Sequence, residues 1–361
     1  MHYSQLNSPC LMVDPLVVKK NIEEMINMIG DVNRLRPHIK THKTAEGILL
    51  MMEAGIHQFK CATIAEAELL ATNGVKDVLL AYQPVGPNVE RLFELQKKYP
   101  SVQFACLTDH IDAANMMGDY FQQFASSMKV YVDLNVGMNR TGIVPTEAFE
   151  LINIIKNHPG LVFAGLHAYD GHHRQTDYHE KEMACEKGLE PVYALIQQLM
   201  VAGFDRPVLI AGGSPSFSVH CKTADRVCSP GTNIFWDHGY ASVCPEQHFE
   251  PAVKILTRVI SLPAPNKICI DLGHKAVASE NELSKRIFFP SHPQLKPVSQ
   301  SEEHMVLETA DNHIFKPGDI LTGIPYHICP TVALHETLHV LNGAMVDDEW
   351  KVAARKRKIS I

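Results

Sequence analysis

Short apolar runs alternate with segments of helical periodicity from about residue 15 to about residue 240. Between the runs lie amphipathic stretches such as 15–29, where apolar residues recur at the spacing of one helix face. The runs, which we predict to be strands, are 35–39, 58–62, 78–82, 103–107, 129–134, 162–167, 208–212 and 226–229. Eight strands that alternate with helices predict a parallel (β/α)8 barrel of the TIM type, with its active site at the carboxyl ends of the strands.

The pattern changes after about residue 250, where shorter strands are joined by Pro, Gly and Asn turns. We predict strands at 252–260, 268–271, 304–307, 319–321 and 338–341. Asn342-Gly343 before 345–346 is a strong two-residue hairpin signal. The chain is therefore predicted to consist of a barrel over 11–248 and a β-rich domain over 249–361 with 1–10. Residues 10–14 are a candidate strand that the N-terminal end lends to this second domain.

Composition excludes several classes of protein. The 361 residues, 45% apolar and 20% charged, are those of a globular protein with room for two domains. A net charge of −7 without a long basic run argues against a nucleic-acid partner. No segment approaches the roughly 20 apolar residues of a membrane span, and the N-terminus lacks the pattern of a secretory signal. Nine irregularly spaced cysteines are typical of reduced thiols, so we expect a cytoplasmic protein.

Residues suited to cofactor chemistry follow the predicted barrel strands. Lys40 ends the first, in RPHIKTHK (36–43), and Arg140 follows the fifth, in VDLNVGMNRTG (132–142). Tyr169 follows the sixth, in GLHAY (165–169), and AGGSPS (211–216) and SPGT (229–232) follow the seventh and eighth. Glycine-rich loops at these last two positions are where barrels commonly bind a phosphate. A phosphate site together with a lysine that can form a Schiff base indicates pyridoxal phosphate.

Each of these motifs also has a plainer interpretation. RPHIKTHK alone is typical of a basic surface loop, and Gly-Gly-Ser is usually a turn. The flanking His38, His42 and Lys43 are either further cations beside Lys40 or polar residues that solvate the loop. Five such motifs in register with one rim of a barrel favour the cofactor site.

Together these motifs resemble the alanine-racemase-type barrel family, in its D-threonine aldolase and D-serine dehydratase branch, over nearly the whole chain. The resemblance implies a pyridoxal-phosphate barrel, a C-terminal β domain and a homodimer. It implies that Lys40 is the Schiff-base lysine, that Arg140 lies near the cofactor ring and that Tyr169 packs on its face. It also implies that the phosphate is held by Gly213, Ser214, Gly231 and Thr232. Ser229 departs from the arginine that alanine racemases place near the pyridine nitrogen, so that contact is in doubt.

A candidate metal pair lies in GIPYHICPT (323–331). If this segment is a strand, His327 and Cys329 share a face and can reach one ion. Imidazole with thiolate favours zinc, with manganese and magnesium as alternatives. A bare His-x-Cys is more often a buried cysteine beside a surface histidine. The resemblance implies a metal pair here, with Cys in the dehydratase branch and usually Asp in the aldolase branch.

The nearby HETLH (335–339) matches the HExxH of zinc proteases, which needs both histidines on one face of a helix. Asn342-Gly343 leaves no room for that helix, so we predict a strand and no protease.

The expected function is a pyridoxal-phosphate- and metal-dependent lyase acting on a small β-hydroxy-D-amino acid. We favour dehydration of the D-serine dehydratase kind because of Cys329, with D-threonine aldolase-like cleavage as the alternative. A metal-independent racemase and a non-catalytic pyridoxal-phosphate carrier are further alternatives. The racemase would need a second base on the opposite face of the cofactor, and the carrier would lack residues 250–361.

Overall fold

The computed structural model describes residues 1–361. The chain forms two compact units, each built from separate segments. The barrel unit consists of Met25–Lys40, Ile48–Gly231 and Lys356–Ile361, and the sheet unit of Met1–Glu24, Thr41–Gly47 and Thr232–Arg355. The predicted domain boundary between residues 248 and 249 stays a prediction.

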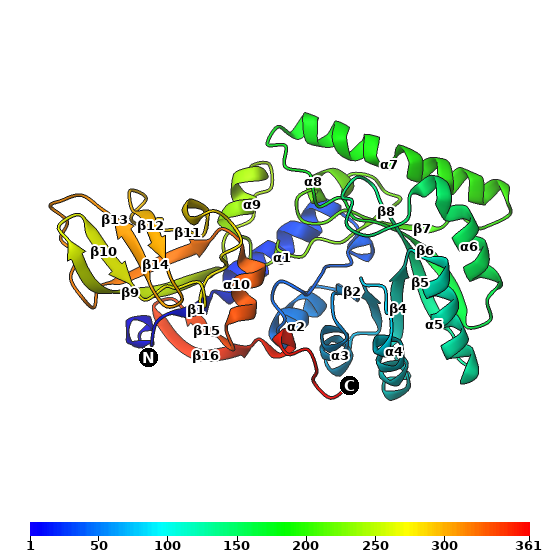
Figure 1. The fold of residues 1–361 in the computed structure, drawn as a ribbon, viewed down its shortest axis with the longest axis horizontal. Helices are drawn as coiled ribbons and strands as arrows, with labels where there is room; N and C mark the ends of the chain where they lie inside the picture. Colours follow the sequence, from blue (N-terminus) through cyan, green and yellow to red (C-terminus); the bar gives the residue numbers. More distant parts are fainter. The chain divides into compact units, whose positions relative to one another are not determined.

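The barrel unit contains a parallel sheet of seven strands in chain order, with helices between them (Figure 1). Its strands are β2 (Gln58–Cys61), β3 (Asp77–Leu80), β4 (Gln103–Thr108), β5 (Met128–Leu134), β6 (Leu161–Ala168), β7 (Val208–Ala211) and β8 (Arg226–Cys228). Its helices include α3 (Ile64–Thr72), α4 (Pro87–Lys98), α5 (Ile111–Gln123), α6 (Ala148–Asn157), α7 (Tyr178–Val201) and α8 (Phe217–His220). The β-α alternation that the apolar runs predict is confirmed.

The first predicted strand, 35–39, is not a regular strand, and this corrects the expected count of eight. The segment instead makes isolated bridges to both edges of the sheet, from Leu35 to Cys228 and from His38 to Lys60. Its backbone donates from Arg36 to Cys228 (2.8 Å) and accepts at Pro37 from Lys60 (2.9 Å). Because Pro37 has no N–H, a continuous ladder cannot form here. The segment therefore joins β8 to β2 without being a strand itself.

The sheet unit contains nine strands, which run in the order β12-β13-β10-β9-β1-β15-β16, with β14 on β9 and β11 on β14 (Figure 1). These are β1 (Cys10–Val13), β9 (Val253–Ala264), β10 (Lys267–Ile270), β11 (Ile287–Phe288), β12 (Lys296–Gln300), β13 (Met305–Glu308), β14 (Ile320–Pro325), β15 (Thr337–Asn342) and β16 (Met345–Lys351). β11 and β12 were not predicted. The N-terminal strand β1 pairs with β9 and β15, which confirms that residues near 10–14 join this sheet. β15 and β16 form the predicted hairpin, with Gly343 at φ +60°.

Four helices lie wholly or partly in the sheet unit's segments: α1 (Pro15–Ile29), α2 (Ala45–Glu53), α9 (His238–Val243) and α10 (Ile328–Leu334). α1 begins and ends where its apolar periodicity predicts. None of the helices combines the length and the apolarity that crossing a membrane requires. All nine cysteines are free thiols, and seven of them are buried.

Candidate functional site

Tyr169 brings together residues that the sequence places after three separate barrel strands. It follows β6 directly, and its ring lies 5.7 Å from Lys40 Nζ and 5.1 Å from Arg140 Cζ, measured to the ring centroid. Both distances allow cation–π attraction. Lys40, Arg140 and Tyr169 therefore form one cluster in the barrel unit, as the motifs predict.

Two glycines leave the space that the Tyr169 ring occupies. A Cβ on Gly213 would lie 2.6 Å from Tyr169 Cε2, and a Cβ on Gly171 would lie 2.1 Å from the Tyr169 hydroxyl oxygen. Real Cβ atoms do not approach other heavy atoms this closely, so a side chain at either position would displace the ring. Gly213 of the predicted phosphate loop and Gly171 after β6 thus set the position of the Tyr169 ring.

This packing predicts the effect of Gly213→Ala. The added methyl group has to push the Tyr169 ring aside, and overpacking of this kind costs about 1–3 kcal/mol. We expect pyridoxal phosphate to bind roughly tenfold more weakly or worse, as measured by fluorescence titration. Gly188→Ala in α7 is the matched control, because its Cβ would have its nearest neighbour, the Val136 carbonyl oxygen, at 3.3 Å. Equal affinities in the two variants would contradict this account of Gly213.

The two predicted phosphate loops meet in the barrel unit. The Gly231 N–H donates to Ser214 Oγ at 3.0 Å, which joins the loop after β8 to the loop after β7. A Cβ on Gly231 would lie 3.0 Å from the His38 carbonyl oxygen, so the close approach depends on glycine. The nearby Ser229 hydroxyl is buried and has no hydrogen-bond partner. The hydroxyls and the glycine backbone of these two loops fit a phosphate group. The unpaired hydroxyl of Ser229 fits a further polar atom of a ligand such as pyridoxal phosphate.

A second lysine completes the cluster, and the sequence analysis missed it. Lys60 on β2 places its Nζ 5.7 Å from the centroid of the Tyr169 ring. It also lies 2.9 Å from His167 Nε2, while His167 Nδ1 lies 2.6 Å from Asp133 Oδ1. Because a carboxylate only accepts, His167 carries its proton on Nδ1 and accepts from Lys60 at Nε2. The order of donation is therefore Lys60 to His167 to Asp133.

Burial and neighbouring groups shift the pKa values of the residues in this hydrogen-bonded series. Burial opposes the charge of Asp133, but the hydrogen bonds from His167 and Thr141 outweigh it and hold the pKa of Asp133 below its usual range. Burial and the charge of Lys40 together lower the pKa of Lys60 to about 7, against the opposing charge of Asp133. Buried groups with perturbed pKa values beside a lysine cluster are typical of functional sites.

Asp170, Cys185 and His220 form a compact buried trio whose ligand atoms lie within 4.8 Å of one another. Hydrogen bonds fix the orientation of Asp170 and His220. Arg226 can only donate, so its 3.0 Å contact makes His220 Nδ1 an acceptor, and His220 Nε2 then donates to Asp170 at 2.7 Å. The other Asp170 oxygen accepts from Ser216 at 2.5 Å. His220 and Ser216 therefore hold Asp170, the residue after Tyr169, against the loop after β7.

His42 is not one of the cations considered for the loop after Lys40. Its side chain is completely buried, and this burial, with the charge of Lys43, lowers the pKa of His42 to about 3. Its Nδ1 accepts from the Thr44 N–H at 3.2 Å. His42 is consequently neutral and shapes the turn.

The metal pair occupies a different local structure from the one predicted. His327 is the residue before α10 and Cys329 lies in the first turn of that helix, so the strand expected here is wrong. Their side chains nevertheless lie within hydrogen-bonding reach, and Glu280 contacts His327 Nδ1. Burial opposes the charge of His327, but Cys329 and Glu280 outweigh it and raise the pKa of His327 to about 9. Imidazole, thiolate and a nearby carboxylate fit a zinc-like ion.

Two threonine hydroxyls contact Cys329. The Thr41 Oγ1 lies 3.1 Å and the Thr232 Oγ1 3.4 Å from its sulfur. Thr41 is the next residue after Lys40 in the chain, and Thr232 is the next after Gly231. The hydroxyl of Thr232, which we predict to bind the phosphate, thus lies beside Cys329. Its binding of the phosphate stays a prediction.

The HExxH segment has no protease geometry. His335 follows the last residue of α10, and its Nε2 donates to the Ala276 carbonyl oxygen at 2.8 Å. His339 lies on β15 beside Glu349, and Glu336 lies in the turn between helix and strand. The two histidines are not on one helix, which agrees with the absence of a helix predicted for this segment.

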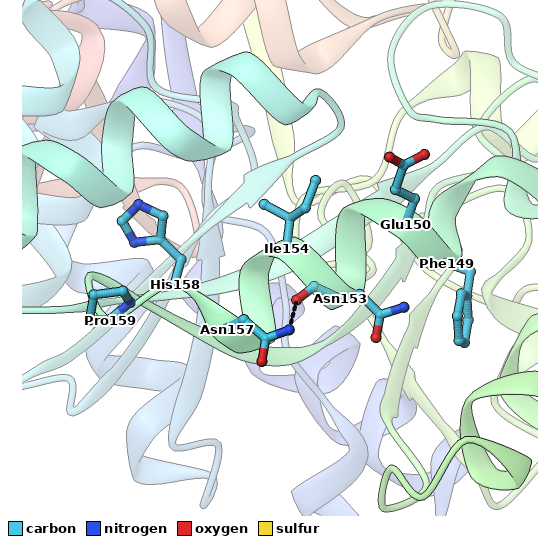
Figure 2. A pocket seen from close by; sticks show the side chains of 7 residues that line it. All are labelled: Phe149, Glu150, Asn153, Ile154, Asn157, His158 and Pro159. Atoms are coloured by element: carbon cyan, nitrogen blue, oxygen red, sulfur yellow. Dashed lines mark hydrogen bonds between the residues drawn. The ribbon is translucent and has the colours of Figure 1, made fainter.

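A hollow of about 630 Å³ lies along α6, and no residue of the Tyr169 cluster lines it. Figure 2 shows the side chains that line it, with Asn157 donating to the Asn153 carbonyl oxygen. Its lining is Phe149, Glu150, Asn153, Ile154, Asn157, His158 and Pro159. This set has no lysine and no glycine-rich loop, so it does not fit the cofactor chemistry.

Comparison with known proteins agrees with this arrangement. The chain is 26% identical to the 3-hydroxy-D-aspartate aldolase of Paracoccus denitrificans (strain Pd 1222), over 98% of this chain and 94% of the relative. It is 24% identical to the D-serine dehydratase of Dictyostelium discoideum, over 94% of each. The crystal structure of D-threonine aldolase from Filomicrobium marinum superposes with a TM-score of 0.88, at 26% identity, over 98% of this chain and 96% of that one.

Family models match both parts of the chain. The model of the alanine racemase N-terminal domain matches residues 13–238, and the model of a putative serine dehydratase domain matches residues 252–341. The first match covers more than half of the chain and includes every residue of the Tyr169 cluster. The chain therefore belongs to the alanine racemase N-terminal domain family, with a serine dehydratase-type domain after the barrel.

Proposed function

We propose that this protein is a pyridoxal-phosphate- and divalent-metal-dependent lyase that removes water from a β-hydroxy-D-amino acid, releasing a 2-oxo acid and ammonia. Relatives named as dehydratases and aldolases of D-amino acids support the lyase class. The nine free cysteines suit a reducing compartment, and the proposal includes a cytoplasmic homodimer. Sedimentation equilibrium of the purified protein tests the dimer.

The observation that carries the proposal is the Tyr169 cluster. One aromatic ring has Lys40 at 5.7 Å and Arg140 at 5.1 Å, and Gly213 of the predicted phosphate loop leaves the room for that ring. A reactive amine, a guanidinium and a glycine-rich anion site around one ring are the parts that pyridoxal phosphate requires. No plainer interpretation of the separate motifs accounts for their convergence.

Each residue of this cluster has a proposed task. Pyridoxal phosphate, when bound, supplies an electron-poor ring that accepts negative charge from the substrate α-carbon. Gly213, Ser214, Gly231 and Thr232 would hold the phosphate, and Tyr169 would pack on the ring. Arg140 lies beside it as a fixed positive charge. Lys40 would be the residue that holds the cofactor covalently, and its free amine would take the substrate α-proton.

His327 and Cys329 are the proposed metal ligands, with zinc favoured over manganese or magnesium because thiolate is a soft donor. A metal ion there would supply Lewis acidity for departure of the β-hydroxyl group. The hydroxyls of Thr41 and Thr232, at 3.1 and 3.4 Å from Cys329, support a metal site that acts together with the cofactor. Both residues directly follow cofactor-site residues in the chain.

Retro-aldol cleavage to glycine and an aldehyde is the second candidate function. The 26% identity to an aldolase, against 24% to a dehydratase, favours it slightly. Cys329 favours dehydration, because the aldolase branch that the motifs resemble usually has Asp at this position.

Product analysis separates the candidate functions. The purified protein, loaded with pyridoxal phosphate and zinc, is incubated with D-serine, D-threonine and D-threo-3-hydroxyaspartate. Dehydration yields pyruvate, 2-oxobutyrate and oxaloacetate, whereas cleavage of D-threonine yields glycine and acetaldehyde. Chiral chromatography of the remaining amino acid reports racemisation. We expect pyruvate, 2-oxobutyrate or oxaloacetate from at least one substrate; a change of configuration alone would replace the lyase with the racemase.

Chelation should separate the metal from the cofactor. The metal ligands lie in the sheet unit and the Lys40 cluster in the barrel unit. We therefore expect EDTA to lower turnover by on the order of 10²-fold or more, since a Lewis acid supplies several kcal/mol. The absorbance band of the bound cofactor should stay unchanged, and added zinc should restore turnover. Full activity after exhaustive chelation would remove His327 and Cys329 from the reaction.

A further inference from the structure

Lys60 occupies a position where a barrel normally has an apolar side chain. It pairs in register with Leu79 of β3, and side chains paired in this way point to the same face of the sheet. Leu79 belongs to the buried cluster with Ala105, Leu107, Tyr131 and Ile210. The Lys60 side chain crosses from β2 to His167 on β6 and is only 2% exposed. A lysine inside this cluster is costly and needs a compensating partner.

The protein itself compensates Lys60 only in part. An ammonium group has three N–H donors and Lys60 has one hydrogen bond, to the neutral ring of His167. No carboxylate forms an ion pair with it, because Asp133 binds His167 and Thr141 instead. Lys40 and Arg140 lie on the same Tyr169 ring and add positive charge. The group therefore has two free donors in a pocket with an excess of positive charge.

We propose that Lys60 is a binding residue of the cofactor pocket, whose ammonium group holds an anionic oxygen that the protein does not supply. This inference rests on the proposed function, because the oxygen comes from the bound molecules. It is either the phenolic oxygen of pyridoxal phosphate or the carboxylate of the amino-acid substrate. The proposed function assigns the phosphate to the loops after β7 and β8, so we do not assign it to Lys60.

The hydrogen bonds of His167 with Lys60 and Asp133 orient the Lys60 side chain. His167 accepts one N–H of Lys60 and is itself fixed by the 2.6 Å hydrogen bond to Asp133, which Thr141 also contacts at 2.9 Å. The ammonium group is thereby held 5.7 Å from the centre of the Tyr169 ring. The lowered pKa of Lys60, about 7, is that of the amine without its anion. An anionic oxygen within hydrogen-bonding distance favours the charged form.

Three substitutions test Lys60. Lys60→Met keeps the length and removes the charge, Lys60→Gln keeps hydrogen-bonding capacity, and Lys60→Arg keeps the positive charge. Lys129→Met is the matched control, because Lys129 also lies on a barrel strand, β5, but is exposed and donates to Gln103 at 2.8 Å. Circular dichroism and thermal unfolding identify the variants that fold. Affinity for pyridoxal phosphate and the absorbance of the bound cofactor are measured without substrate, and KM and kcat with it.

If Lys60 holds the phenolic oxygen of the cofactor, pyridoxal phosphate should bind at least roughly tenfold more weakly to Lys60→Met and Lys60→Gln, and its absorbance band should shift. A partner on the substrate predicts unchanged cofactor binding and a KM raised roughly tenfold, with kcat changed less. Lys60→Arg should restore part of either loss, which a purely structural role would not predict.

The inference is overturned if every folded variant at position 60 matches Lys129→Met within twofold in cofactor affinity, absorbance and KM. It is also overturned if Lys60→Arg is as impaired as Lys60→Met. Failure of the wild-type protein to bind pyridoxal phosphate would overturn the proposed function first, and that result is distinguishable because no variant is needed to see it.

Discussion

Lys40→Ala should abolish covalent attachment of pyridoxal phosphate and lower lyase turnover by roughly 10²- to 10⁴-fold. Lys40 lies 5.7 Å from the centre of the Tyr169 ring, at the start of the loop that follows the closing segment of the barrel. Its proposed tasks are to bind the cofactor and to remove the α-proton, and loss of a positioned base alone costs a factor of this size. Noncovalent binding through the glycine loops should persist, with a weaker affinity.

Borohydride reduction followed by peptide mapping measures the attachment. In the wild-type protein we expect the pyridoxyl label on Lys40. Lys43→Asn is the matched control, because Lys43 belongs to the same loop and has φ +55°, a conformation that Asn tolerates better than Ala. This variant should be labelled normally. A label on Lys43, or on Lys60 in the wild-type protein, would contradict the assignment of Lys40.

The positions of the strand ends were predictable because the apolar runs are short and evenly separated by amphipathic helices. That alternation specifies a parallel sheet, and a parallel sheet brings the residues after its strands to one edge. Lys40, Arg140 and Tyr169 could therefore be grouped before any contact was known. Seven of the eight predicted strands form, and Pro37 explains why the remaining segment makes only isolated bridges.

Lys60 could not be recognised in the same way. Its function depends on a contact across the barrel with His167, more than a hundred residues later in the chain, and periodicity carries no information about such contacts. One signal was present: Lys60 lies between Phe59 and Cys61 in the predicted strand 58–62, and a lysine is unusual in a barrel interior. Asp133 and His167 lay within quoted motifs, but nothing local indicated that they bind each other.

The His-x-Cys motif shows a different limit of sequence interpretation. Alternation on a strand predicted that His327 and Cys329 share a face, whereas the two residues lie at the beginning of α10. Their side chains still meet, because the residue before a helix has extended backbone and the first turn folds back beside it. Seven helical residues between β14 and β15 are too few to give a clear periodic pattern. His327 and Cys329 stay the proposed ligands because their side chains contact each other.

Cys329→Asp should change both the metal preference and the balance between dehydration and cleavage. Thiolate donates more charge to the metal than carboxylate does and selects zinc over manganese or magnesium. We expect the variant to bind zinc at least roughly tenfold more weakly. Dehydration of D-serine with zinc should fall more than any cleavage of D-threonine, because a harder site suits deprotonation of a bound alcohol. Asp at this position is also what the aldolase branch usually has.

The products that wild type and variant form from D-serine and D-threonine, with zinc and with manganese, measure this balance. Cys269→Asp is the matched control, because Cys269 is the other partly exposed cysteine and lies on β10. Its product ratio should equal that of the wild type. If the wild type releases glycine from D-threonine and forms no 2-oxo acid from either substrate, the dehydratase preference is wrong. Cys329 would then be compatible with cleavage, and the residue two positions after His327 would not distinguish the two reactions.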